Sequence, residues 1–498
     1  MLRRNVYNLS GWHASGALVR RCIDLSNPLS TSILLVVIVM LGLFHPAHAN
    51  ESLERLDSSP SAADATNTIE SLSNRILAKQ LEFLRLGLRL KHRGESKNLW
   101  RNRRQSFFAF TNSSLTSIGA FMAATGRLKY ASHPEDAPNK IFENATIVRL
   151  LANSISIGGV LLEVGNDSIG VYKDHKAKLN LRGIGNQADE IQQEVISLVK
   201  QRAEALAKIQ QPDLKRLYQL EEKVLADVHE AALEELGAFY SEAQGKRARR
   251  ITQLSIIFTS NFVSGGGSLY SGIIVPHQFK NDPVRRTRYG GVGGITDIAT
   301  GSANIMMPLL ASGSEMVKRR SAKKVLFKQL GSPNSQDIKQ LKKDEETLRA
   351  AVSSSDPAIS EGFEARRKVI ASFLSVLKRH QEISERERRH AIQKMIVNVL
   401  DSGADASGGF SKVVNGIGGA VGAYRYTFDA NKRFRVQGGT NLAYGIGNAI
   451  AVEEVVRGQI QLERKHAKDE QKHELLTQIM DDEIAQIEDA QRLLLAAD

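Results

Sequence analysis

The residues that could carry catalysis or bind a metal do not form a recognisable site. His229-Glu230 starts like the zinc-binding pattern H-E-x-x-H but lacks the second histidine four positions on. His466 and His473 lie seven residues apart on one charged helical segment. They could bind a metal, but a solvated helix surface explains them better. We therefore expect no metal site.

Glycine- and serine-based motifs are equally uninformative about chemistry. The run Gly416-Ile-Gly-Gly-Ala-Val-Gly422 resembles a dinucleotide loop, but it lies inside an apolar helical stretch instead of between a strand and a helix. Close helix packing explains it better. The sequence has no G-x-S-x-G motif, no phosphate loop and no nucleophile–base pair that the pattern alone supports. We predict a protein that is not an enzyme and has no cofactor.

Basic residues supply the most distinctive local motif. Three signatures of the form Arg-x-Arg-Arg each come before an apolar stretch, 146 and 139 residues apart. A second basic set follows in the predicted hairpin tips. Arginines can anchor a protein on phosphates, or they can pair with acids on the next helix, which is the interpretation we favour. The candidate contacts for an anionic surface are Arg101, Arg103, Arg104, Arg247, Arg249, Arg250, Arg285, Arg286, Arg288, Arg386, Arg388, Arg389, Arg433 and Arg435.

The elements that carry these residues are expected to be helices. Leu77, Leu81, Leu84 and Leu88 keep a 4-3-4 spacing, with charged residues on the other faces. No stretch alternates with period two, so we predict an all-α helical bundle without a sheet. Charged, coiled-coil-like helices alternate with apolar helices rich in glycine and serine.

Matched features indicate three tandem repeats of one long helical hairpin. Each unit reads as a charged helix, an arginine signature, an apolar helix, a polar tip, a returning apolar helix and a charged helix. Gly159, Asn304 and Asn448 recur in the returning helices at intervals of 145 and 144 residues. We assign residues 60–211, 212–356 and 357–498 to the three repeats.

The apolar hairpins allow two interpretations. In a membrane, small residues let helices approach closely; in a soluble bundle, the same residues pack a dry interior. Charges interrupt the apolar helices and favour the soluble bundle, since a charge at bilayer depth costs about 3 kcal/mol or more. They are Asp401, Asp405 and Lys412 in the outgoing stretch of the third unit, and Arg149, Glu163 and Asp297 in the returning helices. From the sequence, we expect only residues 251–279 to be long and uncharged enough for a plausible membrane span. The predicted helix-packing glycines are Gly119, Gly159, Gly265, Gly290, Gly294, Gly418 and Gly422.

The N-terminus decides the expected compartment. A basic leader, an apolar run over residues 32–44 and Ala47-His48-Ala49 are typical of a secretory signal peptide, residues 1–49, with a polar linker over 50–59. An uncleaved anchor is the alternative. The single cysteine, Cys22, lies in the leader, so the mature chain would have no disulfide.

The charge of the chain indicates its class of partner. The formal net charge is +13. An exported basic protein suits a membrane surface or another anionic envelope component, and nucleic acid is not expected. A charge that serves solubility alone is the alternative. Homo-oligomerisation is left open. We predict an exported scaffold or interaction protein of the cell envelope or exterior, associated with a membrane through its glycine-rich hairpins; the alternative is a membrane-inserting or pore-forming helical protein.

Overall fold

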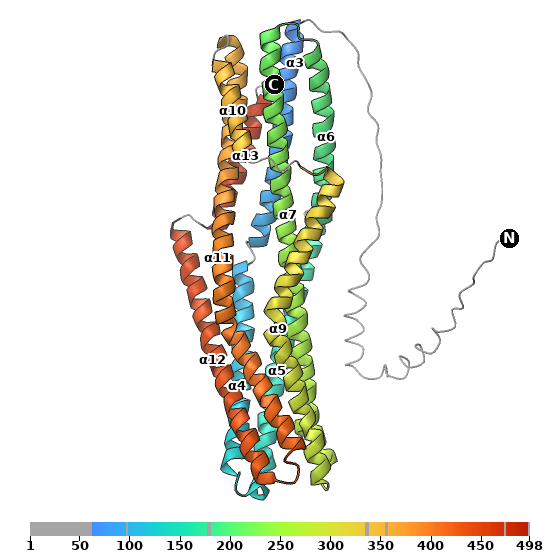
Figure 1. Cartoon of the computed structure of the whole chain (residues 1–498), viewed down its shortest axis with the longest axis vertical. Helices are drawn as coiled ribbons and strands as arrows, with labels where there is room; N and C mark the ends of the chain where they lie inside the picture. Colours follow the sequence, from blue (N-terminus) through green and yellow to red (C-terminus); the bar gives the residue numbers. More distant parts are fainter. Residues whose placement is uncertain are drawn as a thin grey trace, which may run out of the picture. The chain divides into compact units, whose positions relative to one another are not determined.

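The computed structural model describes residues 62–95, 98–176, 181–333, 338–353, 357–472 and 475–496 (Figure 1). The chain divides into residues 1–59 and 60–498, and every described residue belongs to the second unit. These residues form helices, turns and short connections, with no strand among them. The all-α prediction is therefore confirmed for the described part. The predicted signal peptide and linker lie outside it.

The second unit is built from long helices joined by short turns. In chain order they are α3 (Ala62–Glu95), α4 (Asn98–Lys129), the 3₁₀ turn η1 (Pro134–Asp136), α5 (Asn139–Lys176), α6 (Leu181–Ala207), α7 (Pro212–Leu269), the π-turn η2 (Tyr270–Ile274), α8 (Val275–Gln278), α9 (Pro283–Leu330), α10 (Ile338–Ser353), α11 (Pro357–Tyr424), α12 (Ala430–Gln471) and α13 (Leu476–Ala496).

The helix ends follow from local sequence. Asp282 and Asp429 each precede a returning helix, and each side chain accepts a hydrogen bond from the backbone N–H three residues on, at 3.0 Å. Helix α9 ends at Gly331, whose φ is +89°. Residues with a side chain rarely adopt this backbone conformation. Helices α7, α9 and α11 each begin with a proline. Proline lacks a backbone N–H, and the first N–H of a helix would have no acceptor within the helix, so no hydrogen bond is lost there.

A π-turn interrupts the apolar helix after α7. Pro276 has no backbone N–H, and in a regular α-helix its ring clashes with the carbonyl four residues earlier. Here Val275 N–H bonds Tyr270 O, five residues back, which widens the turn just before this proline.

One hydrophobic core joins the charged helices. It is formed by α3, α6, residues 212–250 of α7, the end of α9, α10, residues 357–382 of α11, and α13, which we call the head bundle. The leucine stripe of α3 faces inward, with Leu77 and Leu84 fully buried. Val224 and Phe373 join it from α7 and α11. The leucines that share one face of the predicted amphipathic helix are therefore part of this core.

The apolar helices close a ring of contacts. Helix α4 contacts α5, α5 contacts α7, α7 contacts α9, α9 contacts α11, α11 contacts α12, and α12 returns to α4. We call this the hairpin ring: α4, α5, residues 251–278, residues 283–314 of α9, residues 408–424 of α11, and residues 430–456 of α12. In Figure 1, α4, α5, α9, α11 and α12 carry labels in this region.

A glycine lies at each of the six helix–helix contacts of the ring. A Cβ added to Gly119, Gly272, Gly267, Gly294, Gly418 or Gly445 would meet the neighbouring helix at 2.9 Å or less. At Gly294 the obstacles are backbone atoms, Ala420 N and Gly416 O, both at 2.6 Å. The helices therefore approach too closely for a side chain at these positions.

The predicted packing glycines divide accordingly. Gly119, Gly159, Gly294, Gly418 and Gly422 are in tight contact, and Gly265 makes an ordinary contact with Asn153 at 3.6 Å. Gly290 differs from the prediction, since a Cβ there would meet nothing within 4 Å. Gly291 makes the contact in its place, against Ala423 and Tyr424, because helix rotation turns the neighbouring position toward α11.

Candidate functional site within the hairpin ring

The inside of the hairpin ring is polar. Its helices bury hydroxyl, amide and charged side chains that each keep less than a tenth of their surface exposed. They are Thr116, Ser117, Asn153, Ser156, Glu163, Ser260, Ser264, Thr300, Ser411, Lys412, Asn415, Asn441 and Asn448. Such groups are normally found on protein surfaces, and here they share the interior with small and apolar residues such as Ala152, Val160 and Met307.

The outside of the same ring is apolar. Large hydrophobic side chains stand exposed on every one of its helices, including Phe110, Ile118, Ile147, Leu151, Leu161, Phe262, Leu269, Ile295, Met306, Leu309, Phe410, Ile417, Ile446 and Ile450. Leu151 is 52% exposed and Phe410 is 65% exposed. An exposed apolar surface of this extent marks an interaction with something other than water.

Charged groups lie at the centre of the ring. Asp297 accepts a hydrogen bond from Asn415 Nδ2 at 2.8 Å. Arg149 donates to Asn441 Oδ1, and its guanidinium lies 5.4 Å from the ring centre of Tyr444. Lys412 is only 6% exposed. These ionisable groups come from α5, α9 and α11, so one helix from each of the three hairpins contributes.

A small cavity lies beside Arg149 and Asp297. Arg149, Asp297 and Tyr444 line it together with Thr116, Asn153, Ser264 and Ser268. Its volume of about 10 Å³ is close to the minimum that holds one water molecule. Arg149 Nε is buried without a hydrogen-bond partner among the described residues. The cavity thus has room for one small particle beside an unsatisfied donor.

The first two arginine signatures mark the end of the ring next to the head bundle. Glu163, 1% exposed, accepts from Arg104 Nε at 2.7 Å and from Arg250. Arg101 and Arg250 also pair with Asp167 at 3.2 and 2.8 Å. The signatures of the first and second hairpins therefore converge on one turn of α5.

Further signature arginines pair in the same way. Arg103 makes two bonds of 2.6 Å to Glu463, and Arg249 lies 3.3 Å from Glu315. Each acid belongs to a returning helix: Glu315 lies on α9, which returns after α7, whereas Glu463 lies on α12 of the third hairpin. Arg247 is exposed. The side chains of Arg386, Arg388 and Arg389 lie outside the described residues.

The tips of the three hairpins meet at the other end of the ring. His277 Nε2 lies 3.8 Å from Glu143 Oε1, the rings of Phe142 and Phe434 are 6.0 Å apart, and Arg433 donates to Thr287 Oγ1 at 3.1 Å. Arg285, Arg288 and Arg435 are exposed there, and Arg286 is half-buried. The predicted basic tips thus form one surface.

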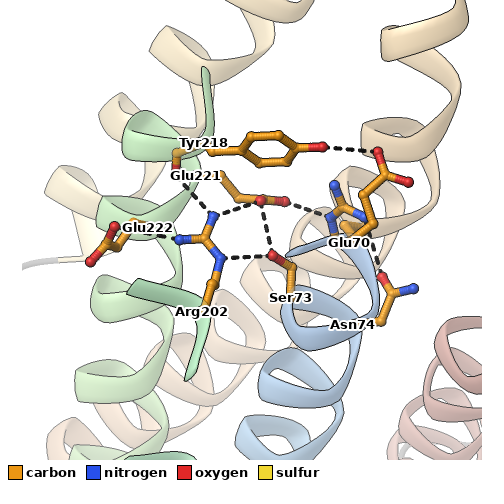
Figure 2. Close-up of polar contacts among 8 residues, drawn as sticks. Glu70, Ser73, Asn74, Arg202, Tyr218, Glu221 and Glu222 are labelled. Carbon is orange, nitrogen blue, oxygen red and sulfur yellow. Dashed lines mark hydrogen bonds and ion pairs between the residues drawn. The ribbon is translucent and has the colours of Figure 1, made fainter. Parts of the chain in front are cut away.

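A second buried polar group lies in the head bundle. Glu221 (α7) accepts from Arg202 Nη2 (α6) at 2.9 Å and from Arg366 Nε (α11) at 2.5 Å. Ser73 Oγ (α3) donates to the same carboxylate at 3.1 Å. Figure 2 shows dashed lines from the Glu221 carboxylate to Arg202 and to Ser73, with Tyr218 pointing to Glu70. Glu221 and both arginines are at most 2% exposed, so this group fixes the relative positions of four helices.

His380 forms a buried ionic contact further along the head bundle. Its Nδ1 lies 3.0 Å from Glu235 and its Nε2 lies 2.7 Å from Glu483. Burial alone would lower the pKa of His380, but hydrogen bonds to the two carboxylates outweigh it and raise the pKa to about 9. The imidazolium is therefore the stable form at neutral pH.

Potential metal ligands are sparse in the described part of the chain. His133, Glu135 and Asp136 lie together at the first tip, and all three are exposed. His466 lies 3.9 Å from Glu470 on the same helix, and His473 lies outside the described residues. Neither arrangement provides the buried, oriented ligands of a typical metal centre.

No match was found. Neither family models, nor curated proteins, nor solved structures resemble this chain. Any assignment therefore rests on the geometry described above.

The sequence revealed the charges in the ring but not their orientation. Arg149, Glu163 and Asp297 were recognised as interruptions of apolar helices. The structure places Glu163 and Lys412 inside the ring and makes Arg149 and Asp297 line its cavity. Asn415, Asn441 and Ser264 carried no signal beyond their polarity. A period of 3.6 residues among the polar positions could have indicated their common face.

Proposed function

We propose that the hairpin ring is embedded in a lipid bilayer and that the head bundle stands in water as an interaction element. The chain would then be a membrane-embedded scaffold that is not an enzyme. One observation carries this proposal: the ring buries many polar side chains while it exposes large hydrophobic ones on every helix. In water that arrangement is unfavourable, whereas lipid tails favour it.

The lengths of the uncharged surfaces support a bilayer. Residues 105–126 of α4 carry no charge and span about 33 Å, while residues 436–452 of α12 span about 26 Å. A hydrocarbon core is about 30 Å thick. Between residues 144 and 166, α5 carries only Arg149 and Glu163, of which Arg149 lines the cavity and Glu163 is buried. In this proposal the two charges of this stretch therefore point away from the lipid.

Average hydropathy recognises only part of this surface. Among the described residues, only Asn139–Lys173 is long and apolar enough to cross a membrane, with a mean hydropathy of 1.6. A third of its apolar window is buried, so most of it is not the core of a soluble bundle. The other ring helices score lower because their inward faces are rich in serine, threonine, asparagine and glycine. An average over both faces hides an apolar outer face.

The tips support one orientation. Residues 280–288 and 425–435 each hold four basic residues and one acid. Short loops rich in lysine and arginine stay on the cytoplasmic side, whereas large domains cross largely regardless of charge. We therefore place the tips in the cytoplasm and the head bundle on the exported side, in agreement with the predicted signal peptide.

Contacts at constant sequence separation support the three tandem repeats. Ser73 contacts Glu221 148 residues on, and Glu221 contacts Arg366 145 residues on. Thr287 and Arg433 meet at a separation of 146 residues. Repeats arranged about a pseudo-three-fold axis bring equivalent positions together in this way. Each unit alone would expose its inward polar face to lipid, so three are needed to close the ring.

Membrane fractionation tests the proposal. The full chain is expressed, and membranes are washed with alkaline carbonate and then floated through a density gradient. A bilayer-embedded ring stays with the lipid after both steps. Release by carbonate in a folded, water-soluble form would overturn the proposal and favour the alternative, a soluble bundle that touches membranes through its basic tips.

A further inference from the structure

We infer that Lys140, Arg288 and Arg435, one basic residue from each hairpin, bind the phosphate groups of anionic phospholipids in the leaflet around the hairpin tips. This inference rests on the proposed location of the hairpin ring in a bilayer. It adds the class of lipid that the tip end recognises and the side chains that recognise it.

The three basic residues continue the apolar outer surface of the ring toward the tips. Residues seven positions apart in an α-helix lie on nearly the same face, about 10 Å apart along the axis. Each returning helix has such a pair, a basic residue followed by a large hydrophobic one, and both members are exposed. The pairs are Lys140 and Ile147 on α5, Arg288 and Ile295 on α9, and Arg435 and Leu442 on α12.

This spacing matches the step from lipid tails to headgroups. The hydrocarbon core of a bilayer is about 30 Å thick, and the headgroup regions add about 5–7 Å on each side. If the hydrophobic member of a pair lies in the outer part of the tails, the basic member therefore reaches the headgroups. A long basic side chain can keep its apolar stem against the tails and place its charge among the phosphates.

An aromatic residue marks the same boundary on α11. Phe410, Ile417 and Tyr424 follow one another at intervals of seven residues, and all three are exposed. Tyrosine is enriched where lipid tails meet headgroups, and Tyr424 is the member nearest the tips. The side chains of Asp401 and Asp405 lie outside the described residues, so this stripe is followed only from Phe410.

The three basic side chains have no acid partner in the described part of the chain. None of them forms an ion pair or a side-chain hydrogen bond there. Acids nearby lie beside other basic side chains, Asp282 beside Arg285 at 3.3 Å, Asp429 beside Lys432 at 3.2 Å and Glu143 beside His277 at 3.8 Å. The phosphate of an anionic lipid would supply the missing negative charge.

The opposite end of the ring differs in this respect. Arg101 lies 3.2 Å from Asp167 there, and Arg103 donates to Glu463 at 2.6 Å. Acids of the chain already balance these charges. The unpaired outward cations therefore lie at the tip end, which the proposed orientation places at the cytoplasmic leaflet, where anionic lipids give the surface a negative potential.

Lipid selectivity in reconstituted vesicles tests the inference. The full chain is placed in phosphatidylcholine vesicles with a trace of spin-labelled phosphatidylglycerol or phosphatidylcholine, and electron spin resonance measures how much of each label the protein immobilises. The wild type should prefer the phosphatidylglycerol label by at least about three-fold. In Lys140→Gln/Arg288→Gln/Arg435→Gln the preference should fall to about one, because the charges that attract the anionic headgroup are gone. Arg288→Lys/Arg435→Lys should retain it.

A variant with the same change in net charge is the matched control. Lys200→Gln/Lys343→Gln/Lys378→Gln removes three exposed lysines of the head bundle, on α6, α10 and α11. It should keep the preference of the wild type, because these side chains lie far from the tips along the chain and stand in water.

Each outcome decides the inference. Equal immobilisation of both labels by the wild type would overturn it and leave the bilayer proposal standing, whereas immobilisation of neither label would overturn both. Equal loss of preference in the two triple variants would also overturn it, since that indicates a response to net charge alone. If the tip variant loses its helical circular dichroism, the three single variants replace it and each should lower the preference; three unchanged preferences would overturn the inference.

Discussion

Arg104 Nε donates a hydrogen bond of 2.7 Å to Glu163 Oε1, which joins the outgoing and returning helices of the first hairpin where they leave the head bundle. Arg250 of the second hairpin reaches the other oxygen of the same carboxylate. A signature that suggested phosphate binding therefore also holds two hairpins together. The buried acid makes this junction sensitive to a single substitution.

Glu163→Gln should destabilise the protein by about 3–5 kcal/mol, since it leaves two arginines around a neutral group at a buried position. Thermal unfolding in detergent measures the change. Glu346→Gln, at an exposed i,i+4 pair with Lys342, is the control and should shift stability by less than about 1 kcal/mol. Equal effects would contradict the structural role of Glu163.

Two glycines four residues apart on α9 should respond in opposite directions. Gly294→Ala places a Cβ against backbone atoms at 2.6 Å and should lower stability by about 1–3 kcal/mol. Gly290→Ala meets open space, and alanine favours a helix over glycine by about 1 kcal/mol, so it should be neutral or stabilising. The unfolding midpoints of both variants decide the matter. Loss at both positions would mean that the α9–α11 contact is described incorrectly.

His380 should make stability depend on pH. Its folded pKa of about 9 lies above the ordinary value of 6.5, so the folded state binds the proton more tightly. The contribution is complete below about pH 6.5 and is lost as the pH rises through 9. The shift corresponds to about 3 kcal/mol. The difference in unfolding free energy between wild type and His380→Gln, measured from pH 6 to 10, should fall over this window; a flat difference would exclude a charged His380.

A charge on the outer face of the ring should impair membrane insertion. Leu151→Arg places a guanidinium near the middle of α5 where 52% of the side chain is exposed, at a cost of about 3 kcal/mol in lipid. The fraction of the protein that resists carbonate should drop. Leu493→Arg in the head bundle, at a leucine 64% exposed, should leave that fraction unchanged. If both behave alike, the exposed leucines of the ring do not face lipid.

Cysteine labelling should report the orientation. Cys22, the only cysteine, is first changed to Ser. Asn281→Cys at an exposed tip should react with a membrane-impermeant maleimide only after the membrane is opened, whereas Lys343→Cys on the exposed surface of α10 should react in intact cells. The reverse pattern would place the head bundle in the cytoplasm.

The sequence alone determined the helical class of the chain and much of its organisation. The leucine spacing of α3 predicts the face that packs into the core of the head bundle, because the buried residues of an amphipathic helix recur every three to four positions. The turns at the three polar tips also lie where the sequence pattern predicts them, since turns depend on nearby residues.

Only the tertiary structure decided which way each helix of the ring faces. Arg149, Asp297 and Lys412 look alike as charges in apolar sequence, whether they point to the interior or outward. Their orientation depends on glycine contacts between residues far apart in the sequence, such as Gly301 with Val413. A small rotation of α9 also makes Gly291, and not the predicted Gly290, the residue that contacts α11. Local spacing cannot fix that rotation, because it is set by the partner helix that closes the ring.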